Sequence, residues 1–305
     1  MIKDNIYGIL EYKLYRFLLK NHIIPSQVIL LMDGGICSQM HQYLLGQLYA
    51  QKGNRIRYDL SFYESWGSDL EQNFVRNFDL LKAFPYLPFR RASATAIRVY
   101  KKKYFVPGNN SGVRLNNFDF LQQVPPIYLG GYYHLPPKIW LETFQQLFKL
   151  RLDVLDVTNR KMYDEIQRRR NSVAVHVRRG DLKVERFDYG KPASEDYFKD
   201  AILYLKQKTV DPYFYFFSDE PVWISETLIP QLNLVDQYKV VDINGSDKGY
   251  MDLFLIASCK HQVTSKGTLG KYGAIMQDSP DKIVILCNDD IEYSWRSLLY
   301  NPVFL

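Results

Sequence analysis

The residues best suited to chemistry form a short basic segment, His176-Val177-Arg178-Arg179-Gly180-Asp181, directly after an apolar run. Alternate side chains of a strand share a face, so His176 and Arg178 lie on the same side. The planar guanidinium of Arg178 can bind two pyrophosphate oxygens at once, whereas a lysine amine acts as a point charge. Gly180 permits a sharp turn, and the carboxylate of Asp181 can hold the guanidinium in place. The alternative is a solvated turn beside a hydrogen-bonded core histidine.

Two further polar segments follow apolar runs. Ser218-Asp219-Glu220-Pro221 comes directly after the aromatic run Tyr213–Phe217, and it belongs either to a binding site or to the cap of a following helix. Ser265-Lys266-Gly267-Thr268 leads into a helical pattern, where free backbone N–H groups favour an anion and Lys266 adds positive charge. Its spacing differs from that of a Walker A loop. Each segment is either part of a ligand site or an ordinary turn.

Several common catalytic motifs do not occur in the sequence. It contains no Asp-x-Asp, which weighs against a metal ion that bridges a pyrophosphate, and no metal site is expected. It contains no His-Glu-x-x-His, Cys-x-x-Cys or Gly-x-Ser-x-Gly, which excludes the metalloprotease, redox and hydrolase classes that use them. Cys37, Cys259 and Cys287 have no regular spacing, so we expect neither a disulfide framework nor a zinc cluster, and a reducing cytosol as the compartment.

The composition is that of a globular protein with a basic balance. Of 305 residues, 47% are apolar and 24% are charged, which excludes wholesale disorder. The net charge of +6 favours an anionic partner such as a nucleotide, a phosphorylated sugar or an anionic membrane surface. The basic residues form no single stripe and no nucleic-acid reader motif occurs, so no nucleic acid is expected as a partner. The sequence shows neither a secretory signal nor an apolar run of membrane-spanning length.

The elements that must position these residues follow from the apolar pattern of the second half of the chain. Continuous apolar strands alternate there with helices, which predicts a parallel, doubly wound sheet. Ligands of such sheets bind beyond the carboxyl ends of the strands, where the polar segments stand. The predicted strands are Ser172–Val177, Tyr213–Phe217, Tyr238–Asp242, His261–Thr264 and Lys282–Leu286, and the predicted helices are Glu195–Lys206, Tyr250–Ser258 and about Gly270–Met276.

The first half of the chain opens in a similar way. Apolar spacing predicts a helix over 5–22, and the strand Val28–Met32, the turn at Gly34-Gly35 and a helix over Ser38–Gln51 begin an α/β lobe. Residues 60–140 are predicted to be loop-rich.

The chain length suggests two domains. A helix over 137–150 is followed by a charged helical stretch over 155–171, which we take as the boundary. We therefore expect an N-terminal lobe of residues 1–165 and a C-terminal lobe of residues 166–305.

Together these segments resemble the α-1,2-fucosyltransferases of glycosyltransferase family 11. The most specific motif of that family, His-x-Arg-Arg-x-Asp, is present as His176 to Asp181. Other family motifs occur in the same order along roughly residues 34–276. They are similar to Gly34-Gly35-Ile36-Cys37-Ser38-Gln39-Met40-His41-Gln42, Phe217-Ser218-Asp219-Glu220-Pro221-Val222-Trp223, Asp252–His261 and, more loosely, Gly130-Gly131-Tyr132-Tyr133.

The resemblance implies a GT-B fold, in which two Rossmann-like lobes enclose a donor cleft and the C-terminal lobe binds a nucleotide sugar. It implies that Arg178 binds the donor pyrophosphate, with His176 and Asp181 ordering the site. It also implies that Asp252 contacts the nucleoside and that the loop 265–269 receives the phosphates. The substrate-binding candidates are His176, Arg179, Ser218, Asp219, Asp252, Ser265, Lys266, Gly267, Thr268, Gly34, Gly35 and Gln39.

The implied reaction is an inverting α-1,2-fucosyl transfer from GDP-fucose to a galactose-containing glycan, without a metal or other cofactor. Inversion requires in-line attack by an acceptor hydroxyl and a carboxylate that takes its proton. Asp181, Glu185 and Asp188 are the candidates, and we prefer Glu185 because Asp181 can be committed to Arg178. The expected catalytic residues are therefore Arg178, Asp181 and Glu185.

The sequence departs from the family pattern near the donor. Lys266 stands where the family has Asn, Lys271-Tyr272 replace a Trp pair, and Ser38 replaces an Asn. Two alternatives therefore stay open: the same fold with another nucleotide sugar, and a non-catalytic nucleotide- or carbohydrate-binding protein. We expect a cytoplasmic protein, whose positive charge and amphipathic N-terminal helix are compatible with peripheral contact with the inner membrane. No oligomeric state follows from the sequence.

Overall fold

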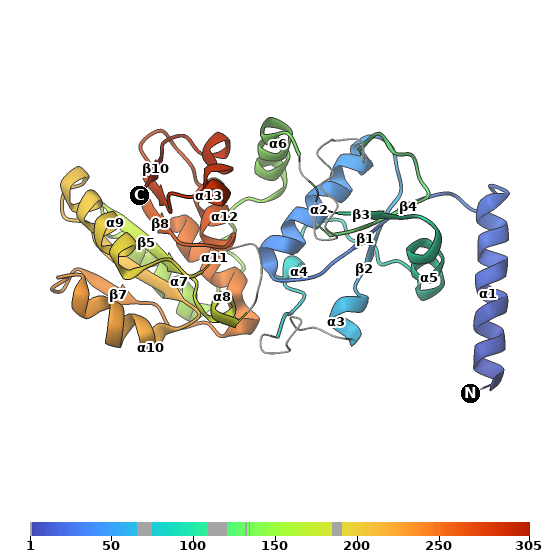
Figure 1. Ribbon diagram of the computed structural model, residues 1–305, viewed down its shortest axis with the longest axis horizontal. Coiled ribbons are helices and arrows are strands. Elements are labelled where there is room, and N and C mark those ends of the chain that lie inside the picture. The colour runs from blue at the N-terminus through green and yellow to red at the C-terminus, as the bar shows by residue number, and fades with distance from the viewer. Residues whose placement is uncertain (1, 66–74, 109–120, 132, 134, 185–190) are drawn as a thin grey trace. The chain divides into compact units, whose positions relative to one another are not determined.

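The chain forms two α/β units, each built on a parallel sheet, in a computed structural model (Figure 1). The structure describes residues 2–65, 75–108, 121–131, 133, 135–184 and 191–305. Unit 1 contains Met1–Ser68, Arg76–Phe78 and Tyr86–Leu147, and unit 2 contains Asp69–Val75, Asp79–Pro85 and Phe148–Leu305. The α/β class and the pair of Rossmann-like units that the sequence predicts are therefore present. Among the described residues, no helix combines the length and apolar character needed to cross a bilayer.

The two units divide the chain earlier than the predicted boundary at 165/166. Helix α7 (Val157–Gln167) packs on the sheet of unit 2 instead of linking two lobes. The short segment Asp79–Pro85, which contains α4 (Leu80–Ala83), also belongs to unit 2. It is anchored there by Phe84, whose ring centroid lies 5.6 Å from that of Phe254. A contact between rings so distant in sequence leaves no periodic pattern that could reveal it.

The described residues of unit 1 form four parallel strands in the order β2-β1-β4-β3. They are β1 (Val28–Leu31), β2 (Ile56–Asp59), β3 (Phe105–Pro107) and β4 (Ile127–Gly130). The helices are α1 (Ile2–Lys20), α2 (Ile36–Gln51), α3 (Ser61–Ser65), α5 (Ala94–Lys103) and α6 (Pro137–Leu147). The predicted opening, from α1 to α2, is confirmed. The prediction of a loop-rich region over 60–140 is wrong in part, because α5, β3 and β4 lie there, and strands of three or four residues are too short to show a period.

In the part of unit 2 that the structure describes, six parallel strands follow the order β10-β9-β8-β5-β6-β7. They are β5 (Ser172–Val177), β6 (Tyr213–Ser218), β7 (Tyr238–Val240), β8 (His261–Thr264), β9 (Val284–Leu286) and β10 (Pro302–Phe304). The main helices are α8 (Gly180–Val184), α9 (Glu195–Lys208), α10 (Pro221–Trp223), α11 (Gly249–Ser258), α12 (Leu269–Met276) and α13 (Asp290–Tyr293). All five predicted strands are confirmed, whereas the three-residue β10 is not predicted.

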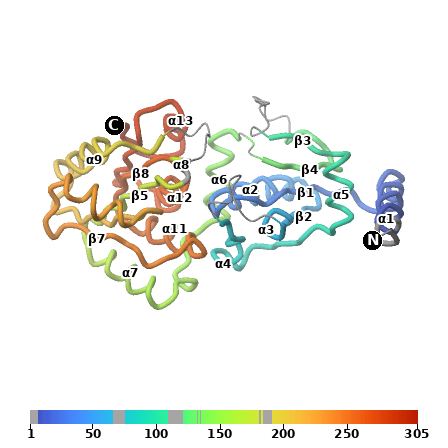
Figure 2. Tube along the Cα trace, turned by 60° about the horizontal axis from the view of Figure 1, so that its bottom comes forward, coloured from blue at the N-terminus to red at the C-terminus, as the bar shows by residue number. Residues whose placement is uncertain are grey.

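Helices cover both faces of the sheet of unit 2, as the alternation of side chains requires (Figure 2). Val173, Val175 and Val177 of β5 are buried in a core with α9. Ala174 is buried on the opposite face, in a core with α7 and α11. Because β6, β5 and β8 are adjacent and parallel, their carboxyl ends meet at one edge of the sheet. The polar segments that follow these strands therefore lie together.

Candidate functional site

The loops after β5 and β8 are joined by hydrogen bonds at this edge of the sheet. The backbone N–H of Arg178 donates to Oγ of Ser265 over 2.9 Å, although the two residues are 87 positions apart. The N–H of Ser265 donates in turn to the carbonyl oxygen of His176 over 3.0 Å. His176 is buried, and Arg178 is half-buried. The structure therefore brings together three of the residues that the sequence predicts for the site.

Gly267 places the backbone of the loop after β8, called the second loop below, directly against the guanidinium of Arg178. Its φ of +90° lies in the region that side chains other than glycine rarely adopt. A Cβ at this position would lie 2.6 Å from Nη1 and 2.7 Å from Cδ of Arg178. Glycine is therefore required here both for conformation and for space. Thr268 follows and is the N-cap residue of α12.

We predict that Gly267→Ala lowers kcat/KM for the reaction proposed below by about 100-fold, because an active group displaced by about 1 Å loses that much. The free energy of unfolding should fall by about 1 kcal/mol from the positive φ. Gly53→Ala is the matched control, since Gly53 has a φ of +81° but open space where a Cβ would lie. Steady-state kinetics of both variants separate the two effects. Equal losses of activity in both would contradict a specific role for Gly267.

Asp219 links the end of β6 to the start of α8. Its carboxylate accepts hydrogen bonds from the backbone N–H groups of Arg179 (3.0 Å) and Gly180 (2.9 Å). Asp219 therefore caps a helix, as one interpretation of the sequence predicts. The helix that it caps is α8, which follows β5, and not the helix that follows Asp219 in sequence. Ser218 accepts the N–H of Glu220 over 3.0 Å and shapes the same loop.

The side chain of Arg179 contacts other side chains of the protein. Its Nε donates to Glu220 over 3.2 Å, and its guanidinium carbon lies 3.5 Å from the ring centroid of Trp223. Lys183 also pairs with Glu220. The side chain of Arg179 is only 16% exposed. Arg178 and Arg179 thus have different surroundings, and of the two arginines it is Arg178 that lies against the loop of Gly267.

Both lysines near the second loop are paired with acids from the segment after β9. Lys266 forms an ion pair with Asp289, whose carboxylate also caps α13 by accepting the N–H groups of Ile291 and Glu292. Lys266 therefore does not present an isolated positive charge to a ligand, as the sequence suggested it would. The sequence did not reveal Asp289, because the two partners lie on different loops.

Lys271 is the second of these lysines, and it is almost fully buried within α12. Its Nζ donates to the carbonyl oxygen of Gly267 over 2.6 Å and to Glu292 over 2.7 Å. The side chains of Lys271 and Glu292 are 2% and 1% exposed. Burial lowers the pKa of Lys271 and raises the pKa of Glu292. A lysine inside the apolar segment Leu269–Met276 is the sequence signal that could have indicated a buried ion pair.

Asp252 lies in the first turn of α11, among amide side chains. Asn244 donates from Nδ2 to Oδ1 of Asp252 over 2.7 Å, and Asn159 donates to Oδ1 of Asn244 over 2.9 Å. Desolvation raises the pKa of Asp252 to about 7, and the neighbouring charge of Asp242 acts in the same direction. The carboxyl group can thus exchange a proton near neutral pH.

This pKa predicts a pH-dependent contribution to stability. Between the ordinary value of 3.8 and about 7, the folded protein keeps a proton on Asp252 that the unfolded chain releases. The stabilisation is present at low pH and is lost as the pH rises through 7. We therefore expect the free energy of unfolding of Asp252→Asn, relative to the native protein, to increase from pH 4 to pH 8. Urea unfolding across this range measures it, and Asp200→Asn, at an exposed position of α9, should show no such trend.

Gly34, Gly35 and Gln39 lie in unit 1, at the start of α2. Gly34 has a φ of +68°, and Gly35 is the N-cap of the helix. The side chain of Gln39 is buried and donates to the carbonyl oxygens of Gly34 (3.1 Å) and Asn77 (2.7 Å). These contacts hold the turn between β1 and α2.

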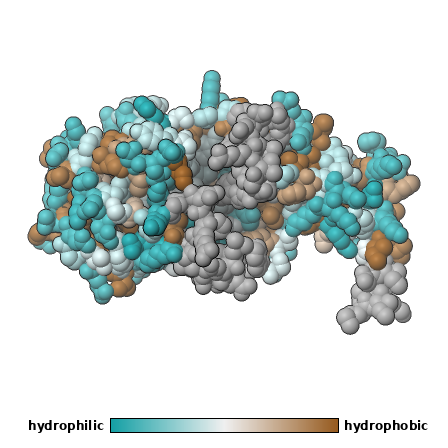
Figure 3. Space-filling view, in the orientation of Figure 1, coloured by the Kyte–Doolittle hydropathy of each residue, from teal (hydrophilic) through white to brown (hydrophobic). Residues whose placement is uncertain are grey.

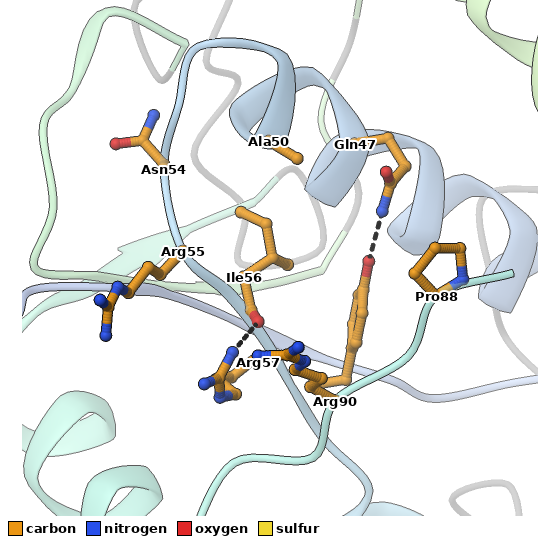
Figure 4. A pocket seen from close by; sticks show the side chains of 9 residues that line it. Gln47, Ala50, Asn54, Arg55, Ile56, Arg57, Pro88 and Arg90 are labelled. Atoms are coloured by element: carbon orange, nitrogen blue, oxygen red, sulfur yellow. Dashed lines mark hydrogen bonds between the residues drawn. The ribbon is translucent and has the colours of Figure 1, made fainter.

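Unit 1 also contains a basic pocket of about 420 Å³ beside β2 (Figure 4). Arg55, Arg57 and Arg90 line it together with Gln47 and Asn54. None of the predicted site residues lines this pocket.

The remaining predicted residues are only partly described. Asp181 belongs to α8, and nothing is described of its side chain. Glu185 and Asp188 lie outside the described residues. Within the described parts of the chain, no group of three or more His, Cys, Asp or Glu side chains could hold a metal ion.

In parallel α/β sheets ligands bind beyond the carboxyl ends of the strands, and Arg178 stands directly after the carboxyl end of β5. The family model for glycosyl transferase family 11 matches residues 92–295, which include the loops after β5, β6 and β8. The chain belongs to glycosyl transferase family 11 and is a glycosyltransferase.

Two curated proteins of Escherichia coli are similar in sequence. The O-antigen biosynthesis glycosyltransferase WbnK is 29% identical over 145 residues, which are 46% of each chain, so the match spans about half of that relative. An alpha-1,2-colitosyltransferase is 22% identical over 271 residues, which are 83% of this chain and 88% of that one.

Solved structures of glycosyltransferases are similar more distantly. POFUT1 in complex with GDP shares 12% identity with a TM-score of 0.46, over 86% of this chain and 98% of that chain. The ADP-heptose heptosyltransferase II of E. coli shares 10% identity with a TM-score of 0.44, over 92% and 90% of the two chains.

Proposed function

We propose that the protein is an inverting, metal-independent glycosyltransferase that transfers a fucosyl group from GDP-fucose to O2 of a galactose unit in a glycan. The observation that carries this proposal is the packing of Arg178 against Gly267, beside the amide groups that begin α12. This arrangement offers a bidentate cation and backbone donors to one diphosphate. Membership of the family supports glycosyl transfer.

The chemistry required of Arg178 follows from the leaving group. When the bond between the sugar C1 and the β-phosphate oxygen breaks, that oxygen gains negative charge. Arg178 and the backbone N–H groups of the 265–269 loop would stabilise this charge more strongly than the charge of the bound donor. In the same step the acceptor oxygen forms its bond to C1 from the opposite face, and its proton passes to a carboxylate. The products are GDP and the extended glycan.

We propose Glu185 as that carboxylate, with Asp181 and Asp188 as the alternatives. Glu185 follows α8, whose start is fixed beside Arg178 by the two hydrogen bonds to Asp219. Amide replacements of all three, assayed with saturating donor, test the choice. The base is the residue whose Asn or Gln variant loses kcat and the acidic limb of the pH–rate profile, while GDP still binds.

The nucleoside is proposed to lie against Asp252, whose carboxyl group is oriented by Asn244 and Asn159. The chain of amides leaves a directed acceptor for ribose hydroxyl or base N–H groups. Ser218, the last residue of β6, and Asp219, which follows it, shape the loop between β6 and α10.

A second candidate donor is a GDP sugar that lacks one hydroxyl of fucose. The observation that favours it is the similarity over 83% of the chain to an enzyme named an alpha-1,2-colitosyltransferase. Colitose is fucose without the 3-hydroxyl group. A site that hydrogen-bonds this hydroxyl would reject colitose by about 10⁴-fold, whereas a site without such a partner would accept both sugars.

The test is thermal unfolding with EDTA present, in GDP, GDP-fucose, GDP-colitose, GDP-mannose, UDP or dTDP at equal concentration. A ligand at 100 times its Kd stabilises by about 2.7 kcal/mol, which shifts the melting temperature by several degrees. Shifts with GDP and GDP-fucose, followed by transfer to a galactoside, support the proposal. A shift only with UDP or dTDP would show that the donor is wrong. Binding of GDP without turnover on any acceptor would favour a non-catalytic protein.

A cytoplasmic location and peripheral contact with a membrane stay proposals. The membrane would contact unit 1 and not the loops around Arg178 in unit 2.

A further inference from the structure

Helix α1 is fixed to unit 1 along one face only. Leu19 is buried in a core with residues of α5, and Tyr12 and Tyr15 pack against the same core. Arg98 of α5 donates to the carbonyl oxygen of Gly8 over 3.2 Å. These contacts leave the opposite face of α1 without a partner in the described part of unit 1.

That opposite face carries a row of large apolar side chains. Tyr7, Leu10, Leu14 and Phe17 are 70%, 57%, 58% and 59% exposed. At 3.6 residues per turn these four positions lie within about a quarter of the helix circumference. We call them the apolar stripe. Single exposed apolar residues are common on protein surfaces, but a continuous row indicates a surface that contacts a membrane or another protein.

A row of basic side chains runs beside the apolar stripe. Lys13, Arg16 and Lys20 are exposed and lie on the side of the stripe next to Phe17. We call them the basic strip. Glu11 is the one acidic residue between Tyr7 and Lys20, and it lies beyond the other edge of the stripe, where it accepts a hydrogen bond from Thr95. Brown apolar and teal hydrophilic residues are both visible on this helix at the right of Figure 3.

We propose that α1 binds the surface of an anionic membrane, with the apolar stripe at the boundary between headgroups and acyl chains. The basic strip then lies at the level of the anionic headgroups, where each lysine or arginine adds attraction. Pairing with α1 of a second copy fits less well, because a second α1 offers one acidic residue between Tyr7 and Lys20, Glu11, against the three cations of the basic strip, whereas an anionic surface complements both rows. This proposal does not depend on which sugar is transferred.

Flotation with lipid vesicles tests the proposal on the full chain. One vesicle type contains phosphatidylcholine alone, and the other contains phosphatidylcholine and phosphatidylglycerol. We expect binding to the anionic vesicles, weakened by salt, and little binding to the neutral ones. The variant Leu10→Ser/Leu14→Ser/Phe17→Ser should lose about tenfold or more in binding.

Two further variants complete the design. Lys13→Gln/Arg16→Gln/Lys20→Gln changes only exposed charges, so it should fold normally and lose both about tenfold or more in binding and most of the salt dependence. Leu203→Ser/Val210→Ser/Val235→Ser removes three exposed apolar residues of unit 2, which are 56%, 82% and 78% exposed, and should bind like the native protein.

Any one of three results would overturn the proposal. The native protein could fail to bind anionic vesicles, both α1 variants could bind as well as the native protein, or the unit 2 control could lose as much binding as the α1 variants. If light scattering instead showed a dimer that the apolar stripe variant dissociates, with no vesicle binding, the occupant of the stripe would be a second copy of the chain.

Discussion

Replacing Arg178 with alanine is expected to lower kcat for glycosyl transfer by about 100- to 1,000-fold, the range found when one donor to a developing oxyanion is removed. The loss should fall mainly on kcat, because the charge on the β-phosphate oxygen is largest in the transition state. The kcat of Arg178→Lys should lie between those of the native protein and Arg178→Ala, since an amine keeps the charge but not the two parallel donors. Steady-state kinetics with GDP release as the readout give both constants.

The matched control is Arg170→Ala. Arg170 is exposed and stands just before the amino end of β5, so the same charge is removed at the opposite end of the strand from the loops. We expect its kinetics to equal those of the native protein. Transfer by Arg178→Ala within about tenfold of the native rate would show that Arg178 does not stabilise the leaving group.

The second large effect is expected from Lys271→Met. This change leaves the carboxylate of Glu292 buried without its cation, which costs about 3–5 kcal/mol and lowers the melting temperature by on the order of 10 °C. Because burial raises the pKa of Glu292, the variant should regain stability as the pH falls and the carboxylate takes up a proton. Thermal unfolding between pH 5 and pH 8 measures both effects.

The double variant Lys271→Met/Glu292→Leu separates folding from loop geometry. Removing both charges together should recover most of the stability, because no unpaired charge remains in the core. It should still bind GDP more weakly than the native protein, since the hydrogen bond from Lys271 to the carbonyl oxygen of Gly267 is missing. Lys199→Met breaks the exposed pair with Asp196 and should change the stability by less than about 0.5 kcal/mol. A double variant that binds GDP normally would show that the pair serves folding alone.

These contacts explain what Lys271 does at the position where the sequence departs from the family pattern. Lys271 is almost fully buried, where it donates to the carbonyl oxygen of Gly267 and pairs with Glu292. The change therefore alters how the loop is supported. Lys266 is likewise engaged by Asp289, so neither lysine adds an unpaired charge to the loop.

The sequence by itself determined the elements of unit 2 and the position of Arg178. Strands β5 and β8 match their predicted bounds, because each buries a continuous run of side chains, and such runs are a property of neighbouring residues. The motif from His176 to Asp181 is local in the same sense. The segment before β4 was missed in part because its short elements gain their stability from packing between distant residues.

Only the tertiary structure decided which polar groups meet. Asp219 was visible as a cap, but its partners are amides 40 and 39 residues away, at the end of the neighbouring parallel strand. The acids that pair with Lys266 and Lys271 come from one further strand along the sheet. An ion pair or a hydrogen bond depends on distance in space, and in a parallel sheet each crossover separates neighbouring strand ends by a whole helix in sequence. The spacing of residues therefore placed the polar loops at the carboxyl ends of the strands, and the order of the strands selected the contacts between these loops.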